Sequence, residues 1–327
     1  MPDLTPQEIS PGVFFLTLPL PMKPSHVHVT LIRTSDGWIQ IDSGIYTDES
    51  VAALEQQWRQ VGCSPERLRW LLVTHHHPDH FGASGVVVER SGASVYLHPA
   101  EVVAAQHYTR RQHSPEALEF FRRHGIPLEK IGPVPAVGAF WAQFYRPAAQ
   151  PLPLGDGQTL DLGGRRVRVI ATPGHTPGHC VFFFPQERLV VVGDHVLPKI
   201  TPHIGRFPGG PENPLGDYLA SLEKIRDLPV DWVLPAHGRA FSDLRRRVEQ
   251  ILQHHQYRLR EMLAAVHGQP RTAYEVACLA WGFDERAPLQ IQFPATFEAL
   301  AHLEYLRAQG KVERQEDERS TRYLARA

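Results

Sequence analysis

Residues 75–80 form a dense cluster of histidine and acidic side chains, with the sequence HHHPDH. The cluster directly follows a short apolar run that predicts a buried strand. A loop leaving such a strand can direct His75 and His77 toward one metal ion. Asp79 and His80 would then face a second ion. Imidazole and carboxylate groups suit zinc, and also iron or manganese. Burying this many polar side chains in a core without partners would cost free energy. The spacing therefore predicts a metal site.

Three further loops carry potential ligands. His175 lies in residues 172–179 (TPGHTPGH), where proline and glycine indicate a rigid turn. It would complete the first set of three nitrogens, with His179 as the competing candidate and a simple tight turn as the alternative. Asp194 follows an apolar run and could bridge two cations through its two oxygens; an Asx turn or a helix cap is its alternative. His237, in Pro-Ala-His-Gly, would be the last ligand of the second ion.

The overall composition limits the class of protein. Histidine is abundant, at 19 of 327 residues, while the formal net charge is only −1. That charge argues against a polyanion partner or an anionic membrane surface. The three cysteines lie far apart and form no CxxC pair, which favours a reducing compartment. We find no apolar stretch of membrane-spanning length and no signal-like start, so a cytoplasmic location is expected.

The predicted elements place these residues at strand ends, where sites gather in layered α/β proteins. Residues 1–241 are expected to form the catalytic domain, with a helical and aromatic insert at about 100–150. Strands are expected at residues 12–18, 26–33, 38–41, 68–74, 94–97, 158–162, 166–171, 180–184, 189–192 and 232–234, and helices at 49–61, 82–90 and 217–228.

The character of the sequence changes after residue 241. A long helix is expected at 243–266, capped by Ser242, then helices at 274–281 and 296–309 and a strand pair at 311–314 and 322–324. Residues 242–327 thus have the element order of a winged helix-turn-helix module. Residues 266–327 hold eight basic and nine acidic side chains, a balance of −1. Without a basic surplus, nucleic acid is not expected as a partner; packing, homodimer formation or a wall of the active-site cleft is favoured.

Five motifs in order resemble the metallo-β-lactamase fold superfamily, and especially hydrolases of the glyoxalase II and β-lactamase-like protein 2 type. They are residues 41–44 (IDSG), 74–80 (THHHPDH), 172–179 (TPGHTPGH), 193–195 (GDH) and 235–238 (PAHG). The resemblance implies an α/β fold, a four-layer αββα sandwich with metal ions at one edge of its sheets. The ligands it implies are His75, His77 and His175 for one metal, Asp79, His80 and His237 for the other, and Asp194 as the bridge.

The resemblance also gives Asp42 a role in bracing the metal loop, a contact of the kind that tunes metal ligands; a turn residue is the alternative. Two zinc ions would lower the pKa of a water molecule between them, so that a bridging hydroxide forms near neutral pH. Asp79, beside that position, could carry protons. Lys199 could contact the substrate by pairing with an anionic group. Residues of the aromatic insert are the other predicted substrate contacts.

The insert carries Trp141 and Tyr145, which could line a substrate pocket or simply pack in the core. Lys199 could equally be a solvated surface residue. The expected activity is hydrolysis of a small thioester, ester or lactone. The rival hypotheses are a phosphodiesterase or ribonuclease of the same fold, a mononuclear iron-dependent oxidoreductase, and a binding protein that kept the fold without activity.

Overall fold

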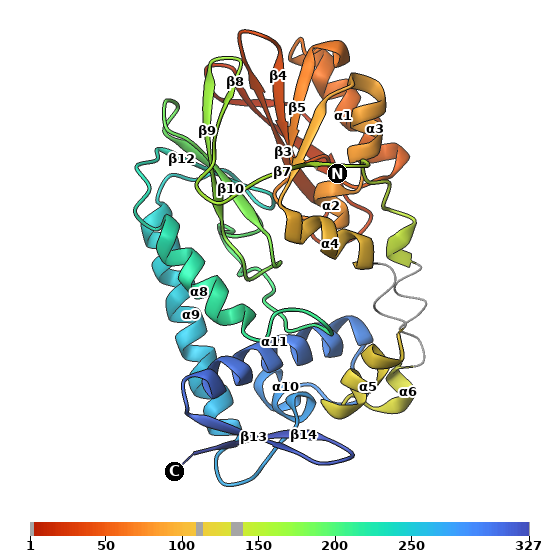
Figure 1. The fold of residues 1–327 in the computed structure, drawn as a ribbon, viewed down its shortest axis with the longest axis vertical. Helices are drawn as coiled ribbons and strands as arrows, with labels where there is room; N and C mark the ends of the chain where they lie inside the picture. Colours follow the sequence, from red (N-terminus) through yellow and green to blue (C-terminus); the bar gives the residue numbers. More distant parts are fainter. Residues whose placement is uncertain (1–2, 109–113, 132–139, 327) are drawn as a thin grey trace.

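Two β-sheets lie face to face in the computed structural model, which describes residues 3–108, 114–131 and 140–326, and a mostly helical part extends from one end of them (Figure 1). The first sheet has the strand order β1 to β7: Gln7–Ser10, Val13–Pro19, His26–Arg33, Trp38–Ile41, Leu68–Leu72, Ser94–Leu97 and Leu152–Pro153. The second has the order β12-β11-β10-β9-β8: Trp232–Pro235, Leu189–Gly193, Cys180–Phe184, Arg165–Ala171 and Thr159–Leu162. Both sheets mix parallel and antiparallel pairs.

Alternating side chains explain why the sheets stack. In β10, Phe182 faces the first sheet through an apolar cluster between the two sheets. Its neighbours Val181 and Phe183 belong to a different cluster, which lies against helices. Because successive side chains of a strand point to opposite faces, a strand that is apolar throughout must be covered on both sides. The second sheet is therefore an internal layer.

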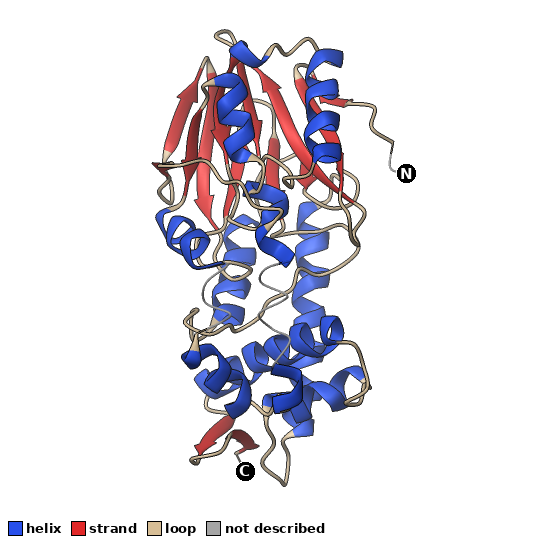
Figure 2. Ribbon diagram, turned by 90° about the vertical axis from the view of Figure 1, so that its right-hand side faces the viewer, coloured by secondary structure: helices blue, strands red, loops and turns tan. Residues whose placement is uncertain are grey.

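Helices cover both outer faces, so the layers run helix, sheet, sheet, helix. Figure 2 looks onto one of these faces, where helices lie in front of the strands. Helices α1 (Asp48–Gln60) and α3 (Ser84–Ser91) pack on the first sheet, and α8 (Pro214–Ile225) and α9 (Leu244–Ala265) on the second. This arrangement confirms the predicted α/β sandwich. A short 3-10 helix, Pro65–Arg67, leads into β5.

Helix α9 runs from the second sheet into the helical part of the molecule (Figure 1). There it packs with α10 (Ala273–Trp281) and α11 (Leu289–Ala308), which precede the antiparallel pair of β13 (Val312–Glu316) and β14 (Thr321–Ala325). The predicted order of elements is present. Several predicted boundaries shift by one or two residues, and two helix starts differ in a way that has a local cause. Asp243 caps α9, not Ser242, because its side chain accepts a hydrogen bond from the Arg246 amide at 3.1 Å. Helix α11 begins at Leu289, with Pro294 inside it, and not at Thr296.

The predicted insert splits between the two parts of the molecule. Helix α4 (Pro99–Tyr108) follows β6, whereas α5 (Pro115–Arg123) and α6 (Leu128–Ile131) lie beside α10 and α11 (Figure 1). Phe121 of α5 packs in a cluster with Tyr274 and Phe297. Residues 109–113 and 132–139 of the insert lie outside the described part of the chain. Among the described residues, no helix combines the length and apolar character needed to cross a bilayer.

Candidate metal centre

All seven predicted metal ligands follow the carboxyl ends of strands. His75 and His77 come after β5, and the short helix α2 (Pro78–Phe81) carries Asp79 and His80. The remaining three follow β9, β11 and β12: His175, Asp194 and His237. Loops from neighbouring strands of two stacked sheets meet at one edge, so residues up to about 160 positions apart converge.

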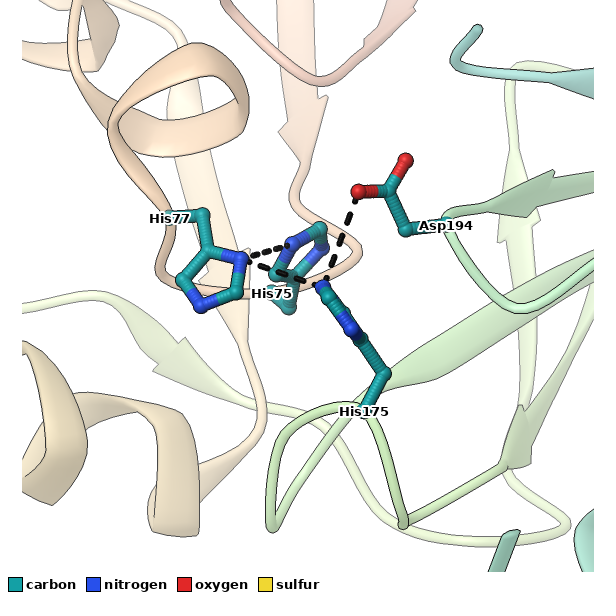
Figure 3. Close-up of side chains that lie close together, drawn as sticks. All are labelled: His75, His77, His175 and Asp194. Atoms are coloured by element: carbon teal, nitrogen blue, oxygen red, sulfur yellow. Dashed lines mark hydrogen bonds and ion pairs between the residues drawn. The ribbon is translucent and has the colours of Figure 1, made fainter. Parts of the chain in front are cut away.

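One group consists of His75, His77, His175 and Asp194, whose potential ligand atoms all lie within 4.8 Å of one another (Figure 3). The Nδ1 atom of His77 is 3.0 Å from Nε2 of His75 and 3.1 Å from Nε2 of His175. His175 Nδ1 donates to the backbone oxygen of His203 at 2.8 Å, which leaves its Nε2 lone pair facing the group. Three ring nitrogens therefore point at one position.

The second group consists of Asp79, His80 and His237. Asp194 lies between the groups and presents one oxygen to each. Its Oδ2 is 3.6 Å from His175 Nε2, while its Oδ1 is 3.6 Å from His80 Nε2 and 3.4 Å from His237 Nε2. The geometry matches a carboxylate that serves two cations.

The two carboxylates of Asp79 and Asp194 attract positive charge to the second group. His237 Nδ1 donates to the His26 carbonyl oxygen at 3.0 Å, so its Nε2 faces Asp79 and Asp194. Burial opposes protonation of His237, but the two carboxylates outweigh it and raise its pKa to about 9. Among the described residues, the buried His80 Nε2 and Asp194 Oδ1 have no hydrogen-bond partner. Unpartnered buried polar atoms are costly, and a cation between them would remove that cost.

The first group is suited to binding metal in its neutral form. Burial, together with neighbouring imidazoles, lowers the pKa of His75 and of His77 well below the usual range. Neutral imidazole is the form that ligates metals. The donor set of histidine nitrogens and carboxylate oxygens therefore fits divalent metal ions.

Asp42 joins the metal-binding loop to β4. Its Oδ1 accepts from the Thr74 amide at 2.7 Å, and its Oδ2 accepts from His80 Nδ1 at 2.8 Å. Asp42 has a φ of 62°, which is rare for a residue with a side chain. The bond to His80 fixes the ring so that its Nε2 points to the centre.

Glu101, in α4, is a residue that the sequence analysis missed. Its buried carboxylate accepts from the His76 amide at 2.8 Å, from His76 Nδ1 at 2.5 Å and from the Gly178 amide at 2.6 Å. It thus fastens the loop of residues 75–80 to the loop that carries His175. The only sequence signal is an acidic residue shortly after the end of β6.

The other predicted residues lie outside the two groups. His179 is buried, and its Nδ1 lies 2.9 Å from Thr172 Oγ1, so His175 and not His179 joins the first group. Tyr145 packs against Phe81, with ring centres 6.1 Å apart, and Trp141 contacts two phenylalanines of its own segment. Lys199 is exposed and lines a separate hollow.

The chain belongs to the metallo-beta-lactamase superfamily, whose family model matches residues 22–237. A second model, the metallo-beta-lactamase-like C-terminal domain, matches residues 259–326. This is a superfamily made up mostly of hydrolases, and its fold implies bound divalent metal ions.

Two solved structures resemble the whole chain. A metallo-beta-lactamase family protein from Thermus thermophilus is 32% identical, with a TM-score of 0.83, and the match covers 98% of this chain and 100% of that one. A beta-lactamase domain protein from Burkholderia ambifaria is 28% identical, with a TM-score of 0.86, over 98% and 93%. Both matches include the C-terminal part.

A curated relative is named atrochrysone carboxyl ACP thioesterase, from Aspergillus fumigatus. It is 32% identical over 127 residues, which is 39% of this chain and 38% of that protein. The matches to the first curated relatives span only about a third of their lengths, from 32% to 38%.

Proposed function

We propose that the chain is a dinuclear metal-dependent hydrolase that holds two zinc ions and acts on a thioester. The observation that carries the proposal is Asp194, which presents one carboxylate oxygen to each group of ligands. A single-metal site would not need this arrangement. His75, His77 and His175 would hold one ion, and Asp79, His80 and His237 the other.

The bound cations would lower the pKa of a water molecule and polarise the carbonyl oxygen of the substrate. The side chains prepare that chemistry. Asp42 and the His203 carbonyl hold the rings of His80 and His175 in place, so their ligand atoms are positioned before substrate binds. Asp79, partly exposed and 3.3 Å from His237 Nε2, is placed to accept a proton at its carboxylate oxygen.

A thioester is favoured over the other substrates because a curated relative is named as a thioesterase acting on an acyl carrier protein. Esters and lactones present a similar carbonyl and remain secondary candidates. A phosphodiesterase is less favoured because the chain carries a formal net charge of −1 and no surplus of basic residues. The intact histidine pair of residues 75 and 77 also argues against a di-iron oxidoreductase; ligand types alone do not decide against mononuclear iron.

For the C-terminal segment we propose a winged-helix-like module that supports the catalytic domain and does not bind nucleic acid. Its helix α11 contacts the segment that follows Asp194, since His203 Nε2 lies 2.9 Å from the Pro294 backbone oxygen. The Arg206 amide also donates to the Phe297 oxygen at 3.0 Å. The division at residues 241 and 242, a homodimer and a cytoplasmic location remain predictions.

The experiment that tests this proposal compares the purified protein with its His77→Ala variant. Metal content is measured by elemental analysis, and turnover is measured on a panel of thioesters, lactones, nitrocefin and bis-p-nitrophenyl phosphate. We expect zinc in the parent protein, turnover of thioesters, and loss of both metal and turnover in the variant. Turnover by a metal-free His77→Ala protein would refute the mechanism, and activity confined to the phosphodiester would refute the substrate class.

A further inference from the structure

A hollow of about 400 Å³ is lined in part by residues 239–243, which follow His237 in the chain, and none of the seven proposed metal ligands lines it. Its walls come from the start of α9, the segment before it, and Pro198 and Lys199. Gly238 packs closely on Pro198, within a distance that a Cβ atom would not tolerate. The hollow is therefore adjacent to the metal-centre loops but separate from the ligand groups.

The side chains around this hollow are strongly basic, in contrast to the chain as a whole. Asp243 is the only acid among its lining residues. Four cationic side chains line it: Lys199, Arg239, Arg246 and Arg247. Arg246 pairs with Asp243 at 3.2 Å. Within the described part of the chain, no carboxylate pairs with Lys199 or Arg239. Among the described residues, these two cations therefore have no carboxylate partner.

Arg247 is held in place without any carboxylate. Its guanidinium donates to the carbonyl oxygens of Leu197 at 2.6 Å and Ile200 at 2.7 Å, and to Gln250 Oε1 at 3.1 Å. These neutral acceptors position the group but leave its charge uncompensated, and partial burial lowers its pKa. Each of its two terminal nitrogens keeps one further N–H, so this fixed arginine can still donate charge-assisted hydrogen bonds to a phosphate.

The first turn of α9 adds to the positive potential. Residues 245–247 are all arginine, and no acid lies within that turn of a 22-residue helix. Cations at a helix N-terminus oppose the helix dipole, which favours negative charge there. Asp243 and Asp227 offset the charges of Arg246 and Arg245, which leaves the charge of Arg247 for a bound anion to balance.

Aromatic side chains give the hollow an apolar wall. Trp232, 36% exposed, and Phe241 both line it. An exposed indole face beside several cations suits a ligand that combines a planar organic group with a charged group. We propose that this hollow binds a small organic phosphate, with Lys199, Arg239 and Arg247 around the phosphate and Trp232 against its organic part.

The test is calorimetric titration of the full-length protein at fixed ionic strength, with adenosine 3′,5′-bisphosphate and inorganic phosphate as the two probes. We expect saturable binding of the bisphosphate, about tenfold or more tighter than that of phosphate. The double variant Lys199→Gln/Arg239→Gln should weaken it about tenfold or more, because each lost charge-assisted contact is a substantial part of such affinity.

Two further variants make the result specific. Arg245→Gln removes one positive charge from the first turn of α9, but Arg245 pairs with Asp227 and does not line the hollow, so binding should be unchanged. Asp194→Asn disrupts the proposed metal centre and should also leave binding unchanged. Equal affinity for inorganic phosphate, equal loss in Arg245→Gln, or loss in Asp194→Asn would each overturn the proposal, and none depends on hydrolase activity.

Discussion

Two buried clusters of charged side chains, one in each part of the molecule, show opposite ways of balancing charge. In the C-terminal part, the buried Glu304 accepts hydrogen bonds from Arg307, from Arg314 at 3.2 Å and from Tyr323 at 2.6 Å. In the sandwich, Asp194 has oxygens within 3.4–3.6 Å of three imidazoles, and its Oδ1 has no hydrogen-bond partner within the described residues. One cluster is complete within the chain, and the other is not.

The difference separates a structural use of buried charge from a ligand-binding use. Buried carboxylates are stable when each oxygen has donors, as at Glu304. Where ring nitrogens face one another and face carboxylates, by contrast, their lone pairs converge on a position that suits a cation. We therefore expect variants of the sandwich cluster to change metal binding, and variants of the Glu304 cluster to change only stability.

Asp194→Asn is expected to have the largest effect. Loss of one partner of a buried charge cluster typically costs about 3–5 kcal/mol, which is about 10²–10⁴-fold in affinity or rate. We expect metal affinity and kcat/KM for the thioester to fall by about that factor, with the fold retained by circular dichroism. Full metal content in the Asp194→Asn variant would contradict the assignment of the sandwich cluster to metal binding.

Asp42→Asn should have an intermediate effect. Asparagine tolerates the positive φ of this position, so the backbone is preserved while the charge behind His80 is lost. Partners of metal-bound histidines are typically worth about 10–100-fold in metal affinity. Competition with a chelator measures the change, and the exposed Asp36→Asn is the matched control. An unchanged affinity would show that Asp42 is only a turn residue.

Glu304→Gln should lower stability and leave the metal centre intact. The amide loses charge-assisted bonds to two arginines, a loss of about 1–3 kcal/mol in the free energy of unfolding. Urea denaturation measures it, and elemental analysis should show the parent metal content. Loss of metal in this variant would mean that the two clusters are not independent.

The same pair of proteins should differ least in acid. Burial opposes ionisation of Glu304, but Tyr323 and Arg307 outweigh it and lower its pKa below 4.5. A lowered folded-state pKa stabilises the protein above the unfolded-state value, and that stability is lost as pH falls through the folded-state value. The stability gap between parent and Glu304→Gln should therefore shrink as pH falls below about 5 and on through the lowered folded-state pKa of Glu304. A gap that widens in acid would reverse the assigned sign.

The sequence allowed prediction of those parts of the site that depend on local spacing. Four of the predicted ligands lie within the six residues 75–80, and the remaining ones follow apolar strands. Glu101 could not be predicted in this way, because its partners His76 and Gly178 are 25 and 77 positions away and meet only in the folded sandwich. The same holds for the His203 carbonyl that orients His175.

The predicted fold was limited for similar reasons. Apolar runs predicted the individual strands, whereas the sandwich itself was implied by the family resemblance of the five motifs. The insert was assigned to the catalytic domain, yet Phe121 of α5 packs against Tyr274 and Phe297 of the C-terminal helices. Such packing depends on which apolar faces meet, which periodicity alone does not specify.

The most direct test of the proposed centre is the metal content of the purified protein, measured together with anomalous diffraction at the zinc edge. We expect about two zinc ions per chain, one beside His75, His77 and His175 and one beside Asp79, His80 and His237, with Asp194 touching both. A protein that binds no metal under saturating zinc, or a single ion that leaves Asp79 and His237 without a ligand role, would contradict the account.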